Sequence, residues 1–318
     1  MSVKVMESYD FIILGGGGAG LAGSMYAARL GMKVLVLGFS HGTDLPIGGV
    51  ITTTDIVENY PGFTKVTGFE LAKKLEEHAR SYDLVTIKTE KAEEIKNEKG
   101  GFLVKTRKSE YRGKTVLFAT GTRWRKLEVP GAEKFMNRGV HYCALCDGPL
   151  YKNKIVAVIG GSDSAVKDAL FLSEHAKKVY IIYRGEKVHP EPINLKRIEK
   201  NKKIEVINNT NVIRIDGDES AKSVALDKKH NGSDILKLDG VFVAIGHIIN
   251  SELAGPLGVK MNKENEIVIN HMTSETSVPG VFAAGDVTDK PFKQLIVGVA
   301  DACTAAYSAS EYIGRKGL

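Results

Sequence analysis

Two cysteines, Cys143 and Cys146, are separated by two residues, and Asp147 follows them directly. Sulfurs at this spacing can cycle between a dithiol and a disulfide, and the free N–H groups at the start of a helix favour a thiolate. The spacing also suits half of a zinc site or a structural disulfide, but zinc usually needs a second pair of cysteines. Cys303 is the one other cysteine in the sequence. The pair therefore favours redox chemistry, and we expect no metal site.

Glycine-rich turns precede and follow the cysteine pair in the sequence. The apolar residues 11–14 lead into Gly15, Gly17 and Gly20 in GxGxxG spacing, and an Ala- and Leu-rich stretch and the apolar residues 34–37 come next. Glycines let the backbone approach a pyrophosphate, which the N-terminus of the following helix attracts. This succession of strand, turn, helix and strand predicts a dinucleotide site.

A second unit of the same kind begins at the apolar residues 155–159. Gly160, Gly161 and Ser162 follow them, and then come a predicted helix and a strand at residues 179–183. The chain thus carries two dinucleotide modules. In the second module Ser162 replaces the middle glycine of the spacing, and its Cβ crowds the approach of a phosphate.

Length and composition describe an ordinary globular protein. The 318 residues suffice for two domains, and 43% are hydrophobic and 26% charged. No apolar run approaches the length of a membrane span, and the first residues lack the apolar core of a signal peptide, so we expect a cytoplasmic protein. In that compartment a thiol pair is more often catalytic than structural. The net charge of +6 comes from dispersed basic residues, which argues against nucleic-acid binding.

Near the end of the chain, an apolar stretch closes on Gly285 and Asp286, and a helix of small residues begins near Lys293. An aspartate at a strand end can accept a ribityl or ribose hydroxyl, and a helix N-terminus can stabilise negative charge on a reduced flavin. The alternative role for Asp286 is a helix or turn cap. The remaining pattern predicts a helix over residues 69–82 and strands at residues 85–87, 102–106, 115–119, 204–207, 212–215 and 241–245.

These motifs, in this order, make the chain resemble the low-molecular-weight thioredoxin reductases over nearly its whole length. The matching pieces are residues 15–20, 51–54, 58–62, 119–121, 143–148, 158–161, 243–247 and 281–286. The resemblance implies an α/β fold with two Rossmann-like dinucleotide-binding domains. A discontinuous FAD domain, residues 1–120 and 248–318, would hold an inserted NAD(P)H-type domain, residues 121–247, which carries the cysteine pair. It also implies a homodimer.

The resemblance further implies a reaction. A reduced nicotinamide would pass hydride to the flavin of FAD, the flavin would reduce the Cys143–Cys146 disulfide, and the dithiol would reduce a thioredoxin-like protein. Cys146 would face the flavin, Cys143 would attack the partner disulfide, and Asp147 would be the acid–base group. The alternative for Asp147 is a helix cap. For His141 we favour packing or hydrogen bonding over proton transfer, and we expect Cys303 to lie in the core.

By the same resemblance, the FAD contacts would come from Gly15, Gly17, Gly18, Ala19, Gly20, Gly49, Thr54, Asn59, Thr120, Gly121, Gly285, Asp286, Lys293, Gln294 and Leu295. Those to a nicotinamide nucleotide would come from Gly160, Gly161, Ser162, Ser164, Ala165 and Arg184. Two of the FAD positions depart from the family pattern. Lys293 stands where arginine is usual, which loses bidentate geometry, and Leu295 replaces alanine.

The inserted domain departs further from the family pattern. NADPH-dependent members carry a His-Arg-Arg-x-x-x-Arg motif whose arginines hold the 2′-phosphate, but here only Arg184 remains, with Gly185 and His189 at the other two positions. Each lost contact is worth roughly 1.5–3 kcal/mol, so NADPH would bind on the order of a hundredfold more weakly. We therefore expect poor NADPH use, with NADH or a non-nicotinamide reductant, such as a reduced deazaflavin or a ferredoxin, as the donor.

Two other functions stay open at the level of sequence. One is an FAD-dependent dithiol oxidase that acts on a small molecule and returns electrons to oxygen. The other is a non-enzymatic flavoprotein whose cysteine pair senses redox state. The acid beside the cysteines and the two glycine-rich turns favour the disulfide reductase over both.

Overall fold

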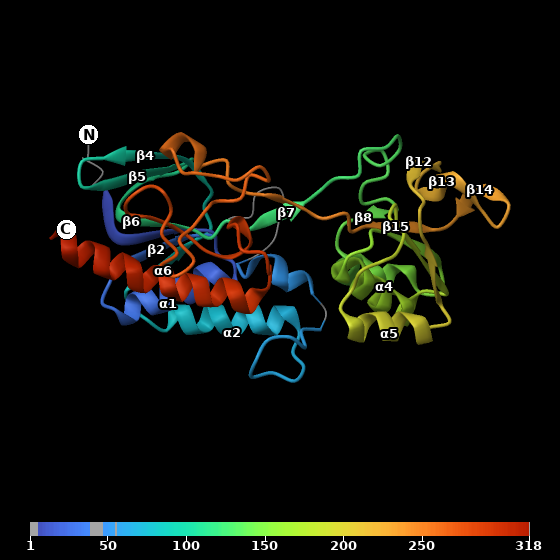
Figure 1. The fold of residues 1–318 in the computed structure, drawn as a ribbon, viewed down its shortest axis with the longest axis horizontal. Coiled ribbons are helices and arrows are strands. Elements are labelled where there is room, and N and C mark those ends of the chain that lie inside the picture. Colours follow the sequence, from blue (N-terminus) through green and yellow to red (C-terminus); the bar gives the residue numbers. More distant parts are fainter. Residues whose placement is uncertain (1–5, 39–46, 55, 318) are drawn as a thin grey trace. The chain divides into compact units, whose positions relative to one another are not determined.

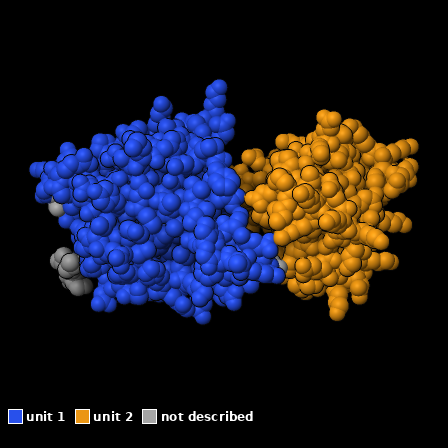
Figure 2. Space-filling view, turned by 60° about the horizontal axis from the view of Figure 1, so that its bottom comes forward, with its two compact units in different colours: residues 1–123, 249–318 blue, residues 124–248 orange. Residues whose placement is uncertain are grey.

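The computed structural model describes residues 6–38, 47–54 and 56–317. The chain divides into two compact units, which are coloured separately in Figure 2. Unit 1 consists of residues 1–123 and 249–318, and unit 2 consists of residues 124–248. Unit 1 is therefore discontinuous in sequence. Both units combine helices with parallel β-sheets, so the α/β class predicted from the sequence is confirmed.

Unit 1 is built on a seven-stranded sheet in the order β3-β2-β1-β6-β5-β4, with β17 also paired to β6. β3, β2, β1, β6 and β17 run parallel, while β4 and β5 extend the sheet in antiparallel fashion. The strands are β1 (Glu7–Leu14), β2 (Val34–Leu37), β3 (Val85–Lys88), β4 (Ala92–Glu98), β5 (Gly101–Thr106), β6 (Glu110–Phe118) and β17 (Val281–Ala283).

Alternate residues of the central strands of unit 1 feed two separate cores. Ile12 and Leu14 join a core that includes residues of the segment 249–287, whereas Phe11 and Ile13 pack against helices. Because both faces of the sheet are covered, residues 11–14 of β1 and 34–37 of β2 are all apolar, instead of alternating between apolar and polar side chains.

The helices of unit 1 are α1 (Gly18–Arg29), α2 (Gly68–Arg80) and α6 (Leu295–Lys316), and Figure 1 shows them lying together. α1 and α6 approach closely because small residues line their contact: a Cβ on Gly23 would lie 3.2 Å from Cβ of Ala302. α2 begins with a capping box, in which the Thr67 hydroxyl accepts from the Glu70 backbone N–H and the Glu70 carboxylate accepts from Thr67.

Unit 2 contains a five-stranded parallel sheet in the order β11-β10-β9-β15-β8. Its strands are β8 (Val140–His141), β9 (Ile155–Ile159), β10 (Lys178–Ile182), β11 (Ile204–Ile207) and β15 (Gly240–Val243). An antiparallel sheet of β12 (Val212–Gly217), β13 (Ala221–His230) and β14 (Ser233–Lys237) joins one core of the unit. The other core holds α4 (Asp163–His175) and α5 (Pro192–Lys200).

The chain passes between the units through β7 (Thr122–Trp124) and β16 (His247–Ile249), which pair as a two-stranded sheet. The elements predicted from sequence are present with shifted ends; the predicted strand at residues 115–119, for example, is the second half of β6. Within the described ranges, no helix has the length and apolarity needed to cross a membrane. In the same ranges, no group of three or more His, Cys, Asp or Glu side chains could hold a metal ion.

Candidate disulfide and nucleotide sites

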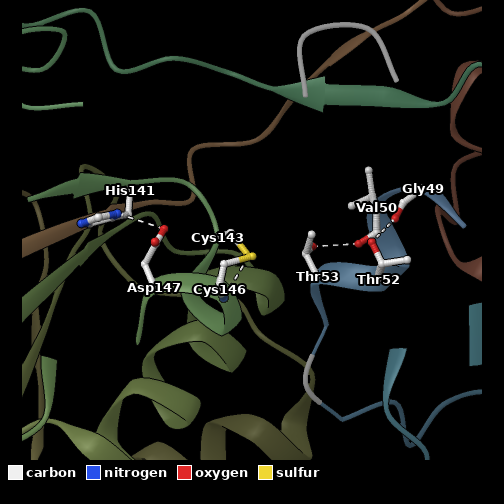
Figure 3. Close-up of a disulfide and its surroundings, with 8 residues drawn as sticks. All are labelled: Gly49, Val50, Thr52, Thr53, His141, Cys143, Cys146 and Asp147. Carbon is white, nitrogen blue, oxygen red and sulfur yellow. Dashed lines mark hydrogen bonds and ion pairs between the residues drawn. A yellow bond between two sulfur atoms is a disulfide. The ribbon is translucent and has the colours of Figure 1, made fainter. Parts of the chain in front are cut away.

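Cys143 and Cys146 form a disulfide in unit 2, with their Cα atoms 5.3 Å apart (Figure 3). Cys143 follows β8 and caps the one-turn helix α3 (Ala144–Asp147), because its Sγ accepts from the Cys146 backbone N–H at 3.1 Å. A backbone donor on sulfur favours the thiolate once the pair is reduced. Cys143 is 9% exposed, and Cys146 is the exposed member of the pair.

Asp147 ends α3 and leads into the short helix η2 (Gly148–Tyr151). Its side chain makes no capping hydrogen bond to η2, and α3 is capped by Cys143 instead. The carboxylate turns toward His141, whose Nδ1 lies 2.9 Å from Asp147 Oδ2 (Figure 3). This is an ion-pair distance, although the carboxylate lies off the direction of a hydrogen bond from Nδ1. The Asp147 carboxylate is therefore paired with His141 and does not serve as a helix cap.

His141 is buried and contacts Phe242, Tyr151 and Asp147. Its side chain is 4% exposed, its ring stacks on Phe242, and its Nε2 lies 2.7 Å from the Tyr151 hydroxyl. Burial lowers the pKa of His141, and Asp147 opposes this only in part. The imidazole is therefore neutral at pH 7. The sequence pointed to packing or hydrogen bonding for His141, and the structure has both; nothing in the sequence pointed to Tyr151.

In unit 1 several of the residues predicted to hold FAD, including Gly15, Thr120 and Gly285, come just after the ends of β1, β6 and β17. A Cβ on Gly15 would lie 2.2 Å from Ala119 O and 3.0 Å from Thr120 N, and one on Gly20 would lie 2.0 Å from Gly15 O. These two glycines are thus required by backbone approach. A Cβ on Gly17, by contrast, would come no nearer to another group than 3.8 Å, from Gly48 O. Gly17 precedes α1 without a side-chain cap, and the first turn of α1 has no acid, so this end suits a pyrophosphate.

Predicted FAD residues from distant parts of the sequence contact one another in this region. The Asn59 amide donates to Gln294 Oε1 at 2.9 Å. Leu295 packs so tightly on α1 that a Cβ on Gly18 would lie 2.4 Å from its Cδ1, and a Cβ on Gly285 would lie 3.4 Å from Cβ of Ala19. Convergence at the carboxyl ends of parallel strands is the usual arrangement of a dinucleotide site. The residues of unit 1 therefore fit FAD.

Other predicted FAD residues are engaged with protein groups. Lys293 Nζ lies 2.8 Å from Glu266 Oε1 and donates to the carbonyls of Asp286 and Thr288. Its charge is therefore already paired, and Glu266 is a partner that the sequence pattern did not indicate. Thr120 donates to Asn250 O at 2.6 Å and precedes Gly121, which has a φ of +58°. Gly49 and Thr54 lie at the two ends of the 3-10 turn that is shown in part in Figure 3.

The second glycine-rich turn, in unit 2, keeps its tight bend but differs at the helix start. Gly160 has a φ of +145°, and a Cβ there would lie 2.1 Å from Ala244 O. Ser162 caps α4, since its Oγ accepts from the Ala165 N–H at 3.5 Å. A side chain of the protein thus takes one of the N–H groups that a phosphate would use.

The segment after β10 lies against the same turn. The Tyr183 ring lies between two glycines: a Cβ on Gly161 or on Gly185 would come within 2.5 Å of its carbons. The His189 N–H donates to Gly161 O at 2.8 Å. Arg184, the one arginine kept from the family motif, is exposed, as is His189. Of the three arginine positions in the family motif, the described residues of unit 2 thus keep one, Arg184.

Comparison with known proteins yields a family and several full-length likenesses. The family model "Pyridine nucleotide-disulphide oxidoreductase" matches residues 9–308. The chain is 35% identical over 315 residues to the "34.2 kDa protein in rubredoxin operon" of Clostridium pasteurianum, covering 99% of this chain and all of that one. It spans only 58–66% of the length of three further curated relatives.

Two solved structures are similar over nearly the whole chain. Thioredoxin reductase of T. acidophilum is 36% identical, with a TM-score of 0.89 and coverage of 96% of this chain and 98% of that one. A ferredoxin-flavin thioredoxin reductase from Clostridium acetobutylicum is 31% identical, with a TM-score of 0.52 and coverage of 98% and 99%.

Proposed function

The chain belongs to the pyridine nucleotide-disulphide oxidoreductase family, whose enzymes depend on FAD and resemble thioredoxin reductase, and we propose that it is a reductase for the disulfide of a thioredoxin-like protein. The observation that carries the proposal is the Cys143–Cys146 disulfide with Asp147 directly beside it. The likeness to thioredoxin reductases over both units supports the choice of partner.

The residues of unit 2 have distinct roles in this proposal. Two electrons and two protons convert the Cys143–Cys146 disulfide to a dithiol. The Cys143 thiolate, favoured by the Cys146 N–H, attacks one sulfur of the partner and forms a mixed disulfide while a partner thiolate leaves. Cys146 then attacks Cys143 Sγ, which releases the second partner thiol and restores the disulfide. Asp147 exchanges protons with the sulfurs.

FAD fits unit 1, and when bound it supplies the two-electron reduction of a disulfide. Gly15, Gly17 and Gly20 would admit its pyrophosphate at the start of α1, because a side chain there would collide or fill the approach. The contacts of Asn59 with Gln294 and of Leu295 with Gly18 would fix the other predicted residues around it. In this proposal unit 1 is the FAD domain, and unit 2 is the inserted domain that carries the cysteines.

We propose further that NADPH is a poor electron donor. Ser162 engages the start of α4, Tyr183 occupies the space between Gly161 and Gly185, and Arg184 has no arginine neighbours in the motif. NADH or a non-nicotinamide reductant would then supply the electrons. The likeness to a ferredoxin-flavin thioredoxin reductase supports the second possibility.

The test should not depend on the donor. FAD-loaded protein is reduced with dithionite, freed of excess reductant and mixed with an oxidised thioredoxin, whose thiols are then alkylated and counted. We expect up to two thioredoxin disulfides to be reduced per chain, one by the Cys143–Cys146 dithiol and one after the reduced FAD has regenerated that dithiol, and none with the Cys143→Ser, Cys146→Ser double variant. If thioredoxin stays oxidised while small dithiols are consumed together with oxygen, the dithiol-oxidase function replaces this one. Light scattering on the same sample tests the expected homodimer.

A further inference from the structure

The buried pair of His141 and Tyr151 is not needed for the thiol–disulfide exchange described above, yet it contacts Asp147. We propose that His141 is a positioning residue: its tautomer is fixed by Tyr151, so that Nδ1–H faces the Asp147 carboxylate and holds it beside the cysteines. This inference rests on the proposed function, because it assigns a supporting group to the acid–base residue of that reaction.

The tautomer follows from the hydroxyl of Tyr151. Tyr151 is 7% exposed, and within the described ranges its hydroxyl contacts one partner, His141 Nε2, at 2.7 Å. A buried hydroxyl whose proton has no acceptor is unfavourable, so the hydroxyl donates to Nε2. Nε2 is then an acceptor, and a neutral imidazole has its single proton on the other nitrogen, Nδ1.

The protonation states of the two groups agree with this assignment. Burial raises the pKa of Tyr151 to about 12, with Asp147 and Asp239 adding to the effect, so the hydroxyl keeps its proton. Burial also lowers the pKa of His141, so the ring is neutral at pH 7. Neutral imidazole in water favours the proton on Nε2, and the protein has therefore selected the other form.

Among the described residues, Asp147 is the one charged partner of the His141 ring. Phe242 of β15 stacks on one face at 5.3 Å, and Tyr151 of η2 meets it edge-on at 5.4 Å. The other charges near this cluster, Asp239 and Lys154, face Tyr151; Lys154 Nζ lies 5.4 Å from the centre of that ring. Asp239 is itself engaged by the Ile155 N–H at 3.0 Å.

The Nδ1–H contact has a consequence for the reaction. A donor on a carboxylate stabilises its ionised, proton-accepting form and restricts its rotation. Nδ1 already lies 2.9 Å from Asp147 Oδ2, so a rotation of the carboxylate that brings it in line with the N–H would form the hydrogen bond. The Asp147 carboxylate is thereby held to one side, next in sequence to Cys146, rather than free to rotate in solvent.

Nitrogen NMR of the imidazole tests the tautomer directly. In full-length, FAD-loaded protein at pH 7, we expect the His141 Nδ1 signal to be of the protonated type and the Nε2 signal of the acceptor type. His141→Asn, which lacks these signals, assigns them. In Tyr151→Phe, which keeps the ring and its packing, the fraction of His141 rings protonated on Nε2 should rise, although the Asp147 carboxylate still favours the proton on Nδ1. A wild-type His141 with its proton on Nε2 would overturn the proposal.

Kinetics of pre-reduced enzyme with oxidised thioredoxin supply the second measurement. We expect Tyr151→Phe to slow the exchange about three- to tenfold and to displace its pH profile, because a charge-assisted contact to a partly exposed carboxylate is weakened. Tyr142→Phe removes a hydroxyl that accepts from the Leu127 N–H and should change neither quantity. His141→Asn keeps a donor near the Nδ1 position and should retain more activity than His141→Leu. A uniform loss of rate without a change in the pH profile would leave a structural role only.

The experiments distinguish failure of the proposed function from failure of the positioning role of His141. If the wild-type dithiol does not reduce thioredoxin, the proposed function fails, but the NMR result still decides whether Tyr151 sets the His141 tautomer. If thioredoxin is reduced and the tautomer is the ordinary one, only the role of His141 falls.

Discussion

Building a 2′-phosphate site into unit 2 should convert the protein into an NADPH-dependent enzyme. A Cβ at position 185 would lie 2.5 Å from the Tyr183 ring, so Gly185→Arg requires that ring to shift. We therefore choose Tyr183→His, Gly185→Arg and His189→Arg together, which places three basic side chains beside Arg184. The new arginines stand at solvent-accessible positions, so we take the lower end of the range for a charge-assisted contact, about 1.5 kcal/mol each. Two such contacts are worth about 3 kcal/mol, or roughly a hundredfold in kcat/KM for NADPH.

The assay is anaerobic stopped-flow measurement of flavin bleaching with NADPH and, separately, with NADH. Ser162→Gly is the matched control. It removes a side-chain cap at a cost of only a few tenths of a kcal/mol and frees an N–H group for either pyrophosphate. Ser162→Gly should raise kcat/KM for both nucleotides alike, whereas the triple variant should raise kcat/KM for NADPH alone. Wild-type bleaching by NADPH with a micromolar KM would refute the reasoning at once. So would a folded, FAD-containing triple variant with no gain.

Three other predictions concern the cysteines and one helix cap. Cys143→Ser should retain FAD but lose thioredoxin reduction, while Cys146→Ser should trap a mixed disulfide with thioredoxin, visible by mass spectrometry; trapping by Cys143→Ser instead would reverse the two roles. Burial raises the pKa of Cys303 to about 11, so after reduction at pH 8 iodoacetamide should label Cys143 and Cys146 well before Cys303; comparable labelling of all three cysteines would contradict this. Thr67→Ala should lower the free energy of unfolding by about 1 kcal/mol in urea titrations, through loss of the capping box on α2, and Thr64→Ala, outside the box, serves as its control.

Local pattern was sufficient to predict the parts of the fold in which one strand leads into one glycine turn. Residues 11–20 and 155–165 show this, because a Cβ on Gly15, Gly20 or Gly160 would lie within 2.2 Å of a backbone oxygen. The cysteine pair and its acid are likewise a local motif, and the structure brings the two sulfurs into a disulfide.

Contacts between distant residues could not be predicted in this way. The Lys293–Glu266 ion pair joins two segments whose approach depends on how β17 and α6 pack. The Tyr183 ring between Gly161 and Gly185 depends on the path of the chain after β10. Tyr151 reaches His141 because η2 turns the chain back toward β8. A single sequence contains no periodicity or spacing from which these contacts between distant residues could be predicted.

The discontinuity of unit 1 has a consequence for synthesis on the ribosome. Phe118 of β6 pairs with Ala283 of β17, and the whole of unit 2 lies between these two residues in the sequence. The small-residue face of α1 is covered by α6, which also follows unit 2 in the sequence. Unit 2 is contiguous, so it can fold as soon as it emerges. The part of unit 1 that precedes unit 2 must wait with α1 uncovered until α6 is made. Nascent chains that stop before α6 should therefore be the species that chaperones hold and that aggregate.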